Sequence, residues 1–517
     1  MLSGQGLGNG INKSRFQKAH RQKQLTVGFL IACKGLGTPE KAKVESQRSD
    51  MKKTLVMKFG GTSVGNAARI LSSARIVQEA AARDRIVVVV SALAGITDRI
   101  LNCVKAAGKG EQATVASALQ EIEARHEEVI ASLFNASNAP KVREQVGAMI
   151  RQLHDLCFAL LQLRSLTPQL LDVALPMGEK LSAQIFAAVL EQSNTPSRYI
   201  DSTEILVTDD HFGDAAADYE ATRPKAHAAI FPLLDEGRVP VVTGFSGATK
   251  QGQPTTLGRG GSDSSATILG AVLECDEVWI WTDVDGVLSA DPRICPDARV
   301  LPEISFTEAI ELSYYGAKVI HHKAIRPTME KKIPVWIKNS FRPEIAGTKV
   351  TGAPYLNGTP VKAVTAVTKA SLVTLVAQND LYVASDILGR MFLRLGHDHV
   401  DILFSTQSSA ENSLGLVVRG EDTDRVTASI ERMFRTELRH GVLKSVEVER
   451  DLAVITVLGE AMKGSYGVIG RIFSAVGARR VSVTAVAQGA SELSICFAVP
   501  AANAPDVIQA IHKEFFH

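Results

Sequence analysis

The sequence predicts an α/β fold with a mainly parallel central sheet, followed by a smaller α+β repeat. Up to about residue 351, apolar runs rich in β-branched residues alternate with helical patterns. These runs lack the polar alternation of strands that face water on one side, as expected for parallel strands covered on both faces. After residue 360, strand and helix patterns recur twice in the same order. The 517 residues, 45% of them hydrophobic, suffice for several domains.

The predicted parallel strands are the apolar runs Thr54–Met57, Ile86–Val90, Val239–Thr243, Val278–Trp281 and Val335–Lys338. Helical patterns separate them, including Ala67–Ala82, Ala113–Leu133 and Ser264–Leu273. Parallel strands joined through helices form a sheet covered by helices on both sides. Ligands of such folds bind beyond the carboxyl ends of the strands, where the polar clusters of this chain occur.

The first polar cluster is a glycine turn that ends the strand in Val56–Val64. Lys58 lies at the strand's end, and Gly60-Gly61 leave backbone N–H groups uncovered because glycine has no Cβ. Thr62 or Ser63 can cap the following helix. The arrangement suits a phosphate, but a strand followed by a glycine turn is also a common structural feature. The lysine precedes the glycines, so this is not a Walker sequence.

Two more clusters suit a small polar ligand. Ser91 and Thr97 flank small residues after the second strand, in a segment that fits either close ligand approach or a tight turn with a helix cap. Glu179 opens an amphipathic helix after Pro176. It could face a substrate ammonium or only complement the helix dipole.

The stretch 257–266 places Arg259 among three glycines and then begins a helix. Arg259 could hold a carboxylate through two hydrogen bonds, while the loop amides face negative charge. Asp263 could equally be a plain helix cap. An acidic turn at 281–287 and a Gly-Ala-Lys-Val segment at 316–319 follow, and ordinary turn or solvent roles explain each of them alone.

In this order, the motifs closely resemble those of the aspartate kinases in the amino acid kinase family. They are KFGGTSV (58–64), VSALAGIT (90–97), MGEKLSA (177–183), LGRGGSD (257–263), WTDVDGV (281–287), DPR (291–293) and ELSYYGAKVIH (311–321). The resemblance runs from about Lys53 to residue 517. Leu288, Ser264 and His322 depart from the family's usual tyrosine, tyrosine and proline, but the charged groups are all present. His321-His322 is not expected to bind metal, because adjacent residues on a helix face different ways.

The resemblance implies a role for each matching residue. Lys58, held by Asp263, would lie with Gly60 and Gly61 against the transferring phosphoryl group. Arg259 would bind the α-carboxylate of L-aspartate and Glu179 its ammonium. Further substrate contacts would be Ser91, Thr97, Gly260, Gly261 and Ser262, and further nucleotide contacts Thr282, Asp283, Arg293, Lys318 and Val319.

The implied reaction is ATP-dependent phosphorylation of the aspartate β-carboxylate to 4-phospho-L-aspartate, with Mg²⁺ on the ATP phosphates. An ionised carboxylate is already a nucleophile, so positioning and charge neutralisation should carry catalysis. One alternative is another kinase of this fold that acts on glutamate, acetylglutamate or a nucleoside monophosphate. A second is an amino-acid sensor with an inactive kinase module.

The predicted domains are a kinase domain over 51–351, a linker over 352–364 and two repeat units over 365–440 and 450–517. Each repeat reads strand-helix-strand-strand-helix, a ferredoxin-like order. The pair resembles tandem ACT domains, with the units intertwined if strands are exchanged. In this family such domains bind an amino-acid effector, here lysine or threonine, and build dimers. Candidate effector contacts are Ser385, Asp386, Gln407 and Asn412, although the repeats could serve only as a dimer interface.

Composition limits the remaining possibilities. A net charge of +2 gives no reason to expect nucleic acid or an anionic membrane as a partner. The six cysteines form no CxxC pair, which favours buried thiols in a reducing cytoplasm over disulfides or a metal site. No apolar run approaches the roughly 18–20 residues of a membrane span. Residues 1–50 are expected to be a disordered extension, with a targeting segment as the alternative.

Overall fold

The computed structural model describes residues 52–316, 320–352, 359–377, 384–398, 400–408 and 413–517. The chain divides into two units, residues 1–53 and 54–517, and the helices and strands of the described residues belong to the second. The prediction for residues 1–50 falls outside the described residues.

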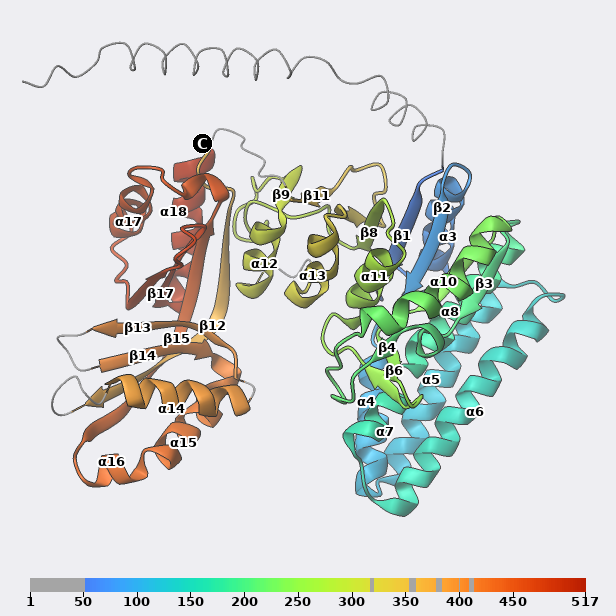
Figure 1. Cartoon of the computed structure of the whole chain (residues 1–517), viewed down its shortest axis with the longest axis horizontal. Coiled ribbons are helices and arrows are strands. Elements are labelled where there is room, and N and C mark those ends of the chain that lie inside the picture. Colours follow the sequence, from blue (N-terminus) through green and yellow to red (C-terminus); the bar gives the residue numbers. More distant parts are fainter. Residues whose placement is uncertain (1–51, 317–319, 353–358, 378–383, 399, 409–412) are drawn as a thin grey trace, which may run out of the picture. The chain divides into compact units, whose positions relative to one another are not determined.

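The first sheet of the second unit has eight strands in the order β3-β5-β2-β1-β8-β10-β11-β9 (Figure 1). The strands from β3 to β10 are all parallel, which confirms the predicted fold class, whereas β11 runs antiparallel to β10. Their bounds are β1 Thr54–Phe59, β2 Arg85–Val90, β3 Ser197–Ile200, β5 Val239–Thr243, β8 Glu277–Thr282, β9 Glu303–Ser305, β10 Val335–Asn339 and β11 Thr348–Thr351. Because β1 lies between β2 and β8, the segment after it meets the loops that follow both neighbours.

Both faces of this sheet are buried, as the unbroken apolar runs predict. Leu55, Met57 and Phe59 of β1 belong to one core cluster, and Val56 between them belongs to another. On the first face lie α3 (Ala67–Ala81), α4 (Ile96–Lys109), α5 (Gln112–Leu133), α6 (Ala139–Leu163) and α8 (Met177–Gln192). On the second lie α10 (Tyr219–Asp235), α11 (Gly261–Val272), α12 (Phe306–Tyr314) and α13 (His322–Lys331).

A small three-stranded sheet and two short helices complete this part of the fold. The sheet has the order β4-β6-β7, with β4 Val207–Thr208, β6 Ser246–Thr249 and β7 Pro254–Thr256. The short helices are α7 (Pro168–Ala174) and α9 (Ser202–Ile205).

One stretch of the described residues corrects the expectation about apolar length. Residues Pro168–Gln192, which contain α7 and α8, reach the length of a membrane span with a mean hydropathy of 1.2. Charged residues interrupt the stretch, so no unbroken apolar run appears in the sequence. Within the fold 72% of its apolar window is buried, and α8 contributes Leu181, Ile185 and Phe186 to the core. The high hydropathy of this stretch is therefore explained by burial of its helices in the core of the domain.

The second sheet has six strands in the order β13-β14-β12-β15-β17-β16. The strands are β12 Ala363–Ala377, β13 Ile402–Ser408, β14 Ser413–Arg419, β15 Leu443–Leu458, β16 Ala485–Gln488 and β17 Ser494–Pro500. The helices are α14 (Ala384–His397), α15 (Thr423–Met433), α16 (Arg435–Arg439), α17 (Val468–Ala478) and α18 (Ala504–Phe516). We call this part of the chain the regulatory sheet. It contains both predicted strand-helix-strand-strand-helix repeats.

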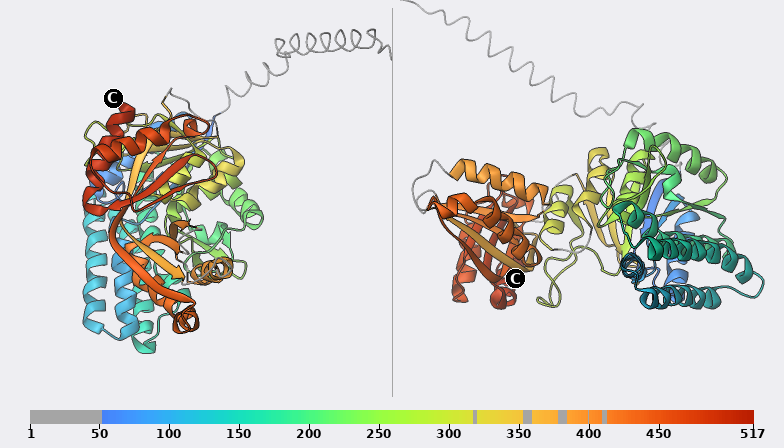
Figure 2. Two further views of the ribbon diagram at one scale, coloured as in Figure 1. Left: turned by 90° about the vertical axis from the view of Figure 1, so that its left-hand side faces the viewer. Right: turned by 90° about the horizontal axis from the view of Figure 1, so that it is seen from below.

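The two repeats share the long strands β12 and β15, which pair antiparallel along their lengths (Figure 2). Ala363 pairs with Leu458 at one end, and Val376 pairs with Ser445 at the other. Each long strand therefore serves both halves, and this arrangement differs from the predicted linear boundaries. The predicted linker 352–364 already enters β12 at its end, and β15 crosses the predicted gap between residues 440 and 450.

Candidate active site

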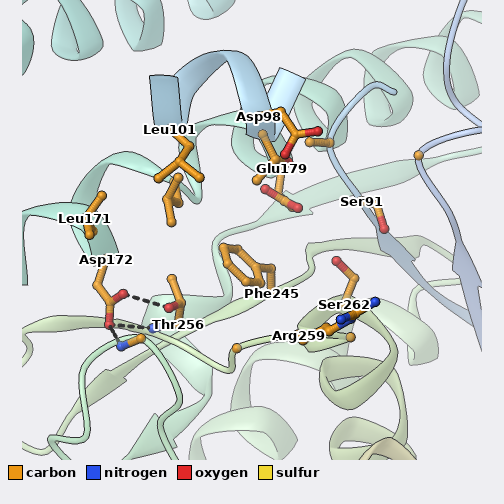
Figure 3. A pocket seen from close by; sticks show the side chains of 18 of the residues that line it. Ser91, Asp98, Leu101, Leu171, Asp172, Glu179, Phe245, Thr256, Arg259 and Ser262 are labelled. Carbon is orange, nitrogen blue, oxygen red and sulfur yellow. Dashed lines mark hydrogen bonds between the residues drawn. The ribbon is translucent and has the colours of Figure 1, made fainter. Parts of the chain in front are cut away.

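A cavity of about 900 Å³ lies beyond the carboxyl ends of β1 and β2, facing the start of α11 (Figure 3). It brings together residues predicted from four separate segments of the sequence. These are Lys58, Gly61, Ser91, Thr97, Glu179, Arg259, Gly260, Gly261, Ser262 and Asp263. Each segment follows a strand or opens a helix, so the parallel sheet collects them at one edge.

Lys58 and Asp263 form a nearly buried ion pair in this cavity. The Lys58 Nζ and Asp263 Oδ1 atoms are 2.5 Å apart, and the two side chains are 10% and 14% exposed. Asp263 lies in the first turn of α11, whose N-cap is Gly260, with no side-chain cap. The plain-cap reading of Asp263 is therefore wrong, because its carboxylate is held by the lysine. The uncapped first turn keeps N–H groups available for an anion.

Glycines shape both loops that reach the cavity. Gly258 and Gly260 have φ values of 70° and 73°, which strain any residue with a Cβ, and they hold the exposed Arg259 between them. At Gly61, a Cβ would stand 3.0 Å from the carbonyl oxygen of Ala92. The turn after β1 can therefore pack directly against the loop after β2.

Glu179 brings a buried carboxyl group to the same cavity. It opens α8 and is 4% exposed, and its Oε2 has no hydrogen-bond partner among the described residues. Burial raises the pKa of Glu179 to about 8, although the Ala92 N–H and the charge of Lys58 act in the opposite direction. Gly178 permits this close packing, since a Cβ there would meet the Ala92 Cβ at 2.8 Å. A buried, open carboxylate oxygen fits a cationic donor of a ligand.

Several lining residues were missing from the sequence prediction. Phe245 lies in the cavity with a positive φ of 72°, and its N–H donates to Ser265 Oγ at 3.0 Å. Its position two residues after the predicted strand 239–243 could have indicated that it lies at the ligand-binding edge of the sheet. Asp172 is fully buried and accepts hydrogen bonds from the N–H groups of Gly213 and Thr256 and from Thr256 Oγ1 (Figure 3). In the sequence, the only indication of this structural role is that Asp172 is the single acidic residue in the mostly apolar segment of α7.

The sequence matches the amino acid kinase family over residues 53–339, more than half of the chain. The chain belongs to the amino acid kinase family. Residues 455–515 also match the ACT domain family, in the second half of the regulatory sheet.

Relatives of this amino acid kinase are aspartokinases. Lysine-sensitive aspartokinase 3 of Escherichia coli is 30% identical over 90% of this chain and 100% of its own length. The crystal structure of E. coli aspartokinase III in complex with aspartate and ADP matches with a TM-score of 0.76 and 30% identity, covering 90% of this chain and 100% of that one. The bifunctional aspartokinase/homoserine dehydrogenase of Buchnera aphidicola is 30% identical over 89% of this chain. The chain spans only 56% of that relative's length.

The predicted nucleotide contacts of this kinase are only partly assembled. The Gly60 N–H donates to the Trp281 carbonyl oxygen at 3.0 Å, which joins the glycine turn to the end of β8 beside Thr282. Thr282 Oγ1 donates to Asp283 Oδ1 at 3.2 Å. Arg293 is 88% exposed in its side chain and pairs with Asp291, and it is not among the residues that line the 900 Å³ cavity. Lys318 and Val319 lie outside the described residues.

The three residues that depart from the family pattern, Leu288, Ser264 and His322, have structural roles in the fold. Leu288 forms an isolated bridge with Val300, and Ser264 is buried in the first turn of α11. His321 is the N-cap of α13 and His322 its first residue, with ring centroids 4.2 Å apart. The expectation that the two rings face different ways is therefore wrong, because only one of them belongs to the helix.

The candidate effector contacts remain predictions. Asp386 is exposed and pairs with Arg390 at 3.3 Å in the first turn of α14. Gln407 is exposed on β13, opposite Leu414. Asn412 and the side chain of Ser385 are outside the described part of the chain.

Proposed function

We propose that this chain is an ATP-dependent aspartate kinase that phosphorylates the β-carboxylate of L-aspartate. The observation that carries the proposal is one cavity holding the Lys58–Asp263 pair, the open carboxyl of Glu179 and Arg259. Arg259 and Glu179 match the α-carboxylate and the ammonium of a free amino acid, and Lys58 matches the negative charge of a phosphoryl group. The E. coli relative bound to aspartate and ADP supports the same substrates.

In the proposed reaction, the protein holds two anions together. Lys58 offsets the negative charge on the transferring phosphoryl group. The Gly60 N–H is bonded to the Trp281 carbonyl oxygen, so the rest of the turn after Gly60 and the start of α11 present N–H groups to the phosphoryl group. Arg259 binds the α-carboxylate and Glu179 the ammonium, which leaves the β-carboxylate directed at the phosphorus. The attacking carboxylate is already ionised, so orientation replaces a general base.

Mg²⁺ is proposed to enter on the ATP phosphates. Asp263 is engaged by Lys58, whereas Asp283 accepts only the Thr282 hydroxyl among the bonds described above and is exposed directly after β8, so Asp283 is placed to face the metal complex. Oxygen ligands of this kind suit Mg²⁺, which would offset phosphate charge when bound.

The open oxygen of Glu179 helps to separate the alternative substrates. N-acetylglutamate has no ammonium, so it would leave this buried carboxyl without a partner. A nucleoside monophosphate likewise has no such group. Glutamate keeps the ammonium and differs by one methylene, so only a substrate comparison distinguishes it from aspartate.

We further propose that an amino-acid effector, lysine or threonine, acts through the regulatory sheet. The helix α12 supports this coupling because both halves of the regulatory sheet bind it. Its Glu308 is fully buried, pairs with Lys362 Nζ at 2.7 Å and accepts the Glu460 N–H at 2.9 Å. At the other end of the helix, Tyr314 and Tyr315 donate to the carbonyl oxygens of residues 402 and 403.

The position of α12 in the sequence explains how its contacts with the regulatory sheet could affect nucleotide binding. The helix ends four residues before Lys318, a predicted nucleotide contact. A shift of either half of the regulatory sheet would therefore move α12, the described helix next to this predicted contact in the sequence. The lysine-sensitive E. coli relative supports an effector of this class, and a homodimer built through the repeats is part of the same proposal.

A cytoplasmic location is proposed as well. The described cysteines are free and buried, which agrees with a reducing compartment.

A hydroxamate assay with ATP, Mg²⁺ and L-aspartate tests the proposed activity, because hydroxylamine traps the acyl phosphate. We expect signal with aspartate and little with glutamate, and inhibition when lysine or threonine is added. Signal with glutamate alone would assign a different substrate. Folded protein without ATP turnover would favour the sensor alternative, and activity unchanged by both effectors at millimolar concentration would reject them as inhibitors.

A further inference from the structure

The loop between β8 and β9, which carries Arg293, packs against α18 of the regulatory sheet. Gln509 Nε2 of α18 donates to the Ile294 carbonyl oxygen at 2.8 Å. Ala290 and Cys295 of the loop share an apolar cluster with Ile511 of the helix. The loop and α18 therefore form one packed seam, although they are far apart in sequence.

Three potential metal ligands meet at this seam: Asp297, His512 and His517. One donor atom from each lies within 4.8 Å of the others. The His512 Nδ1 and Asp297 Oδ1 atoms are 3.8 Å apart, and His517 Nε2 contacts Asp297 Oδ2. His512 is 1% exposed in its side chain, whereas Asp297 and His517 are 50% and 43% exposed. The cluster thus has one fixed ligand and two that can adjust.

The second ring nitrogen of His512 is held as in known metal sites. Its Nε2 lies 3.0 Å from Ser289 Oγ, and that oxygen also accepts the Arg299 N–H at 3.0 Å. A partner on one ring nitrogen fixes the imidazole and directs the other nitrogen at the ligand site. Here the directed atom is Nδ1, and it points to the Asp297 carboxylate at a distance too long for a hydrogen bond.

That distance fits two ligands of a single ion. Bonds from Zn²⁺ to imidazole nitrogen and carboxylate oxygen are about 2.0–2.2 Å, so two donors of one ion lie at most about 4 Å apart. The 3.8 Å separation already satisfies this limit. A small rotation of the half-exposed His517 would bring the third donor within range, and water can complete the coordination.

We propose that Asp297, His512 and His517 bind one divalent transition-metal ion of the kind imidazole prefers, such as Zn²⁺. Neutral imidazole is a common ligand of such ions, and a carboxylate oxygen can complete the set. The ion would fasten the Arg293 loop to α18. This site is separate from the Mg²⁺ that accompanies ATP and does not depend on the kinase activity.

Metal binding by the full chain tests the proposal. After treatment with a chelator, the protein is titrated with Zn²⁺ by calorimetry and with Co²⁺ by visible absorption, which reports the coordination geometry. We expect saturable binding of one ion per chain, weakened at least tenfold in Asp297→Asn and in His517→Ala. Both positions are exposed, so these variants should fold, and thermal melting without metal checks this.

His211→Ala is the matched control, because His211 also pairs with an aspartate, Asp209, on an exposed surface. It should bind Zn²⁺ like the unaltered protein. Absence of saturable binding in the unaltered protein would overturn the proposal. Equal affinity in Asp297→Asn, His517→Ala and the unaltered chain would also overturn it, since the ion would then bind elsewhere.

Discussion

The raised pKa of Glu179 predicts an unusual pH dependence for substrate binding. Only the ionised carboxylate can pair with a substrate ammonium, and burial favours the neutral form up to a pKa of about 8. With this pKa, roughly a tenth of the free enzyme is ionised at pH 7 and roughly three quarters at pH 8.5. We expect kcat/KM for aspartate to rise roughly eightfold over this interval, on the order of 1 kcal/mol. The substrate's amino group keeps its proton over this range.

The matched variant is Glu179→Gln, which has a similar shape and cannot ionise. Loss of the charged contact should lower kcat/KM for aspartate by about 10- to 100-fold at pH 8.5, and the pH dependence should flatten. The KM for ATP serves as the internal control and should change little. The hydroxamate assay at several pH values measures kcat/KM for aspartate, its pH dependence and the KM for ATP.

Folding stability gives a second readout with a defined sign. A buried carboxyl whose pKa is raised on folding favours the neutral form, so its ionisation reduces stability as pH rises from about 4.3 through about 8. Glu179→Gln should therefore unfold at a higher temperature than the unaltered protein at pH 9, while being less active. A flat kcat/KM profile in the unaltered enzyme, or the same rising profile in Glu179→Gln, would refute the assignment of Glu179 to the ammonium.

Three further predictions concern the other charged groups. Lys58→Ala should lower kcat by roughly a hundredfold or more, since it removes the cation at the transferring phosphoryl group, and full activity in the hydroxamate assay would contradict that role. Arg259→Lys should raise the KM for aspartate about tenfold, because lysine lacks the two-pronged geometry, and an unchanged KM would remove Arg259 from the carboxylate site. Lys362→Met should lower the free energy of unfolding, measured in urea, by about 3–5 kcal/mol, because it leaves the buried Glu308 carboxylate without its cation. Lys362→Met combined with Glu308→Leu should recover much of this loss, and equal stability of Lys362→Met and the unaltered protein would show that the ion pair is unimportant.

The sequence alone determined the features that depend on local patterns. Unbroken apolar runs identified five of the parallel strands within a residue or two, for example Val239–Thr243, which the structure reproduces. The short strand β3 (Ser197–Ile200) was missed, because only its last residues are apolar. Glycine positions identified the turns after β1 and before α11, because their backbone conformations or close contacts require the absence of a Cβ. The strand-end rule then placed Lys58, Ser91 and Arg259 at one edge of the sheet.

Only the tertiary structure decided the properties that arise from contacts between distant segments. The helix pattern permitted Asp263 to be a cap, and the partner Lys58 from β1 decided otherwise. Glu179 fits an ordinary helix start in sequence, but its pKa depends on water exclusion by surrounding elements. The pairing of β12 with β15 across both repeats likewise joins strands about 80 residues apart, and the sequence pattern of each strand does not identify its partner. His517 contacts Asp297 across 220 residues, a separation at which spacing carries no information about proximity. Local patterns specify elements and turns, whereas burial, ion pairing and ligand geometry exist only after the chain has brought those elements together.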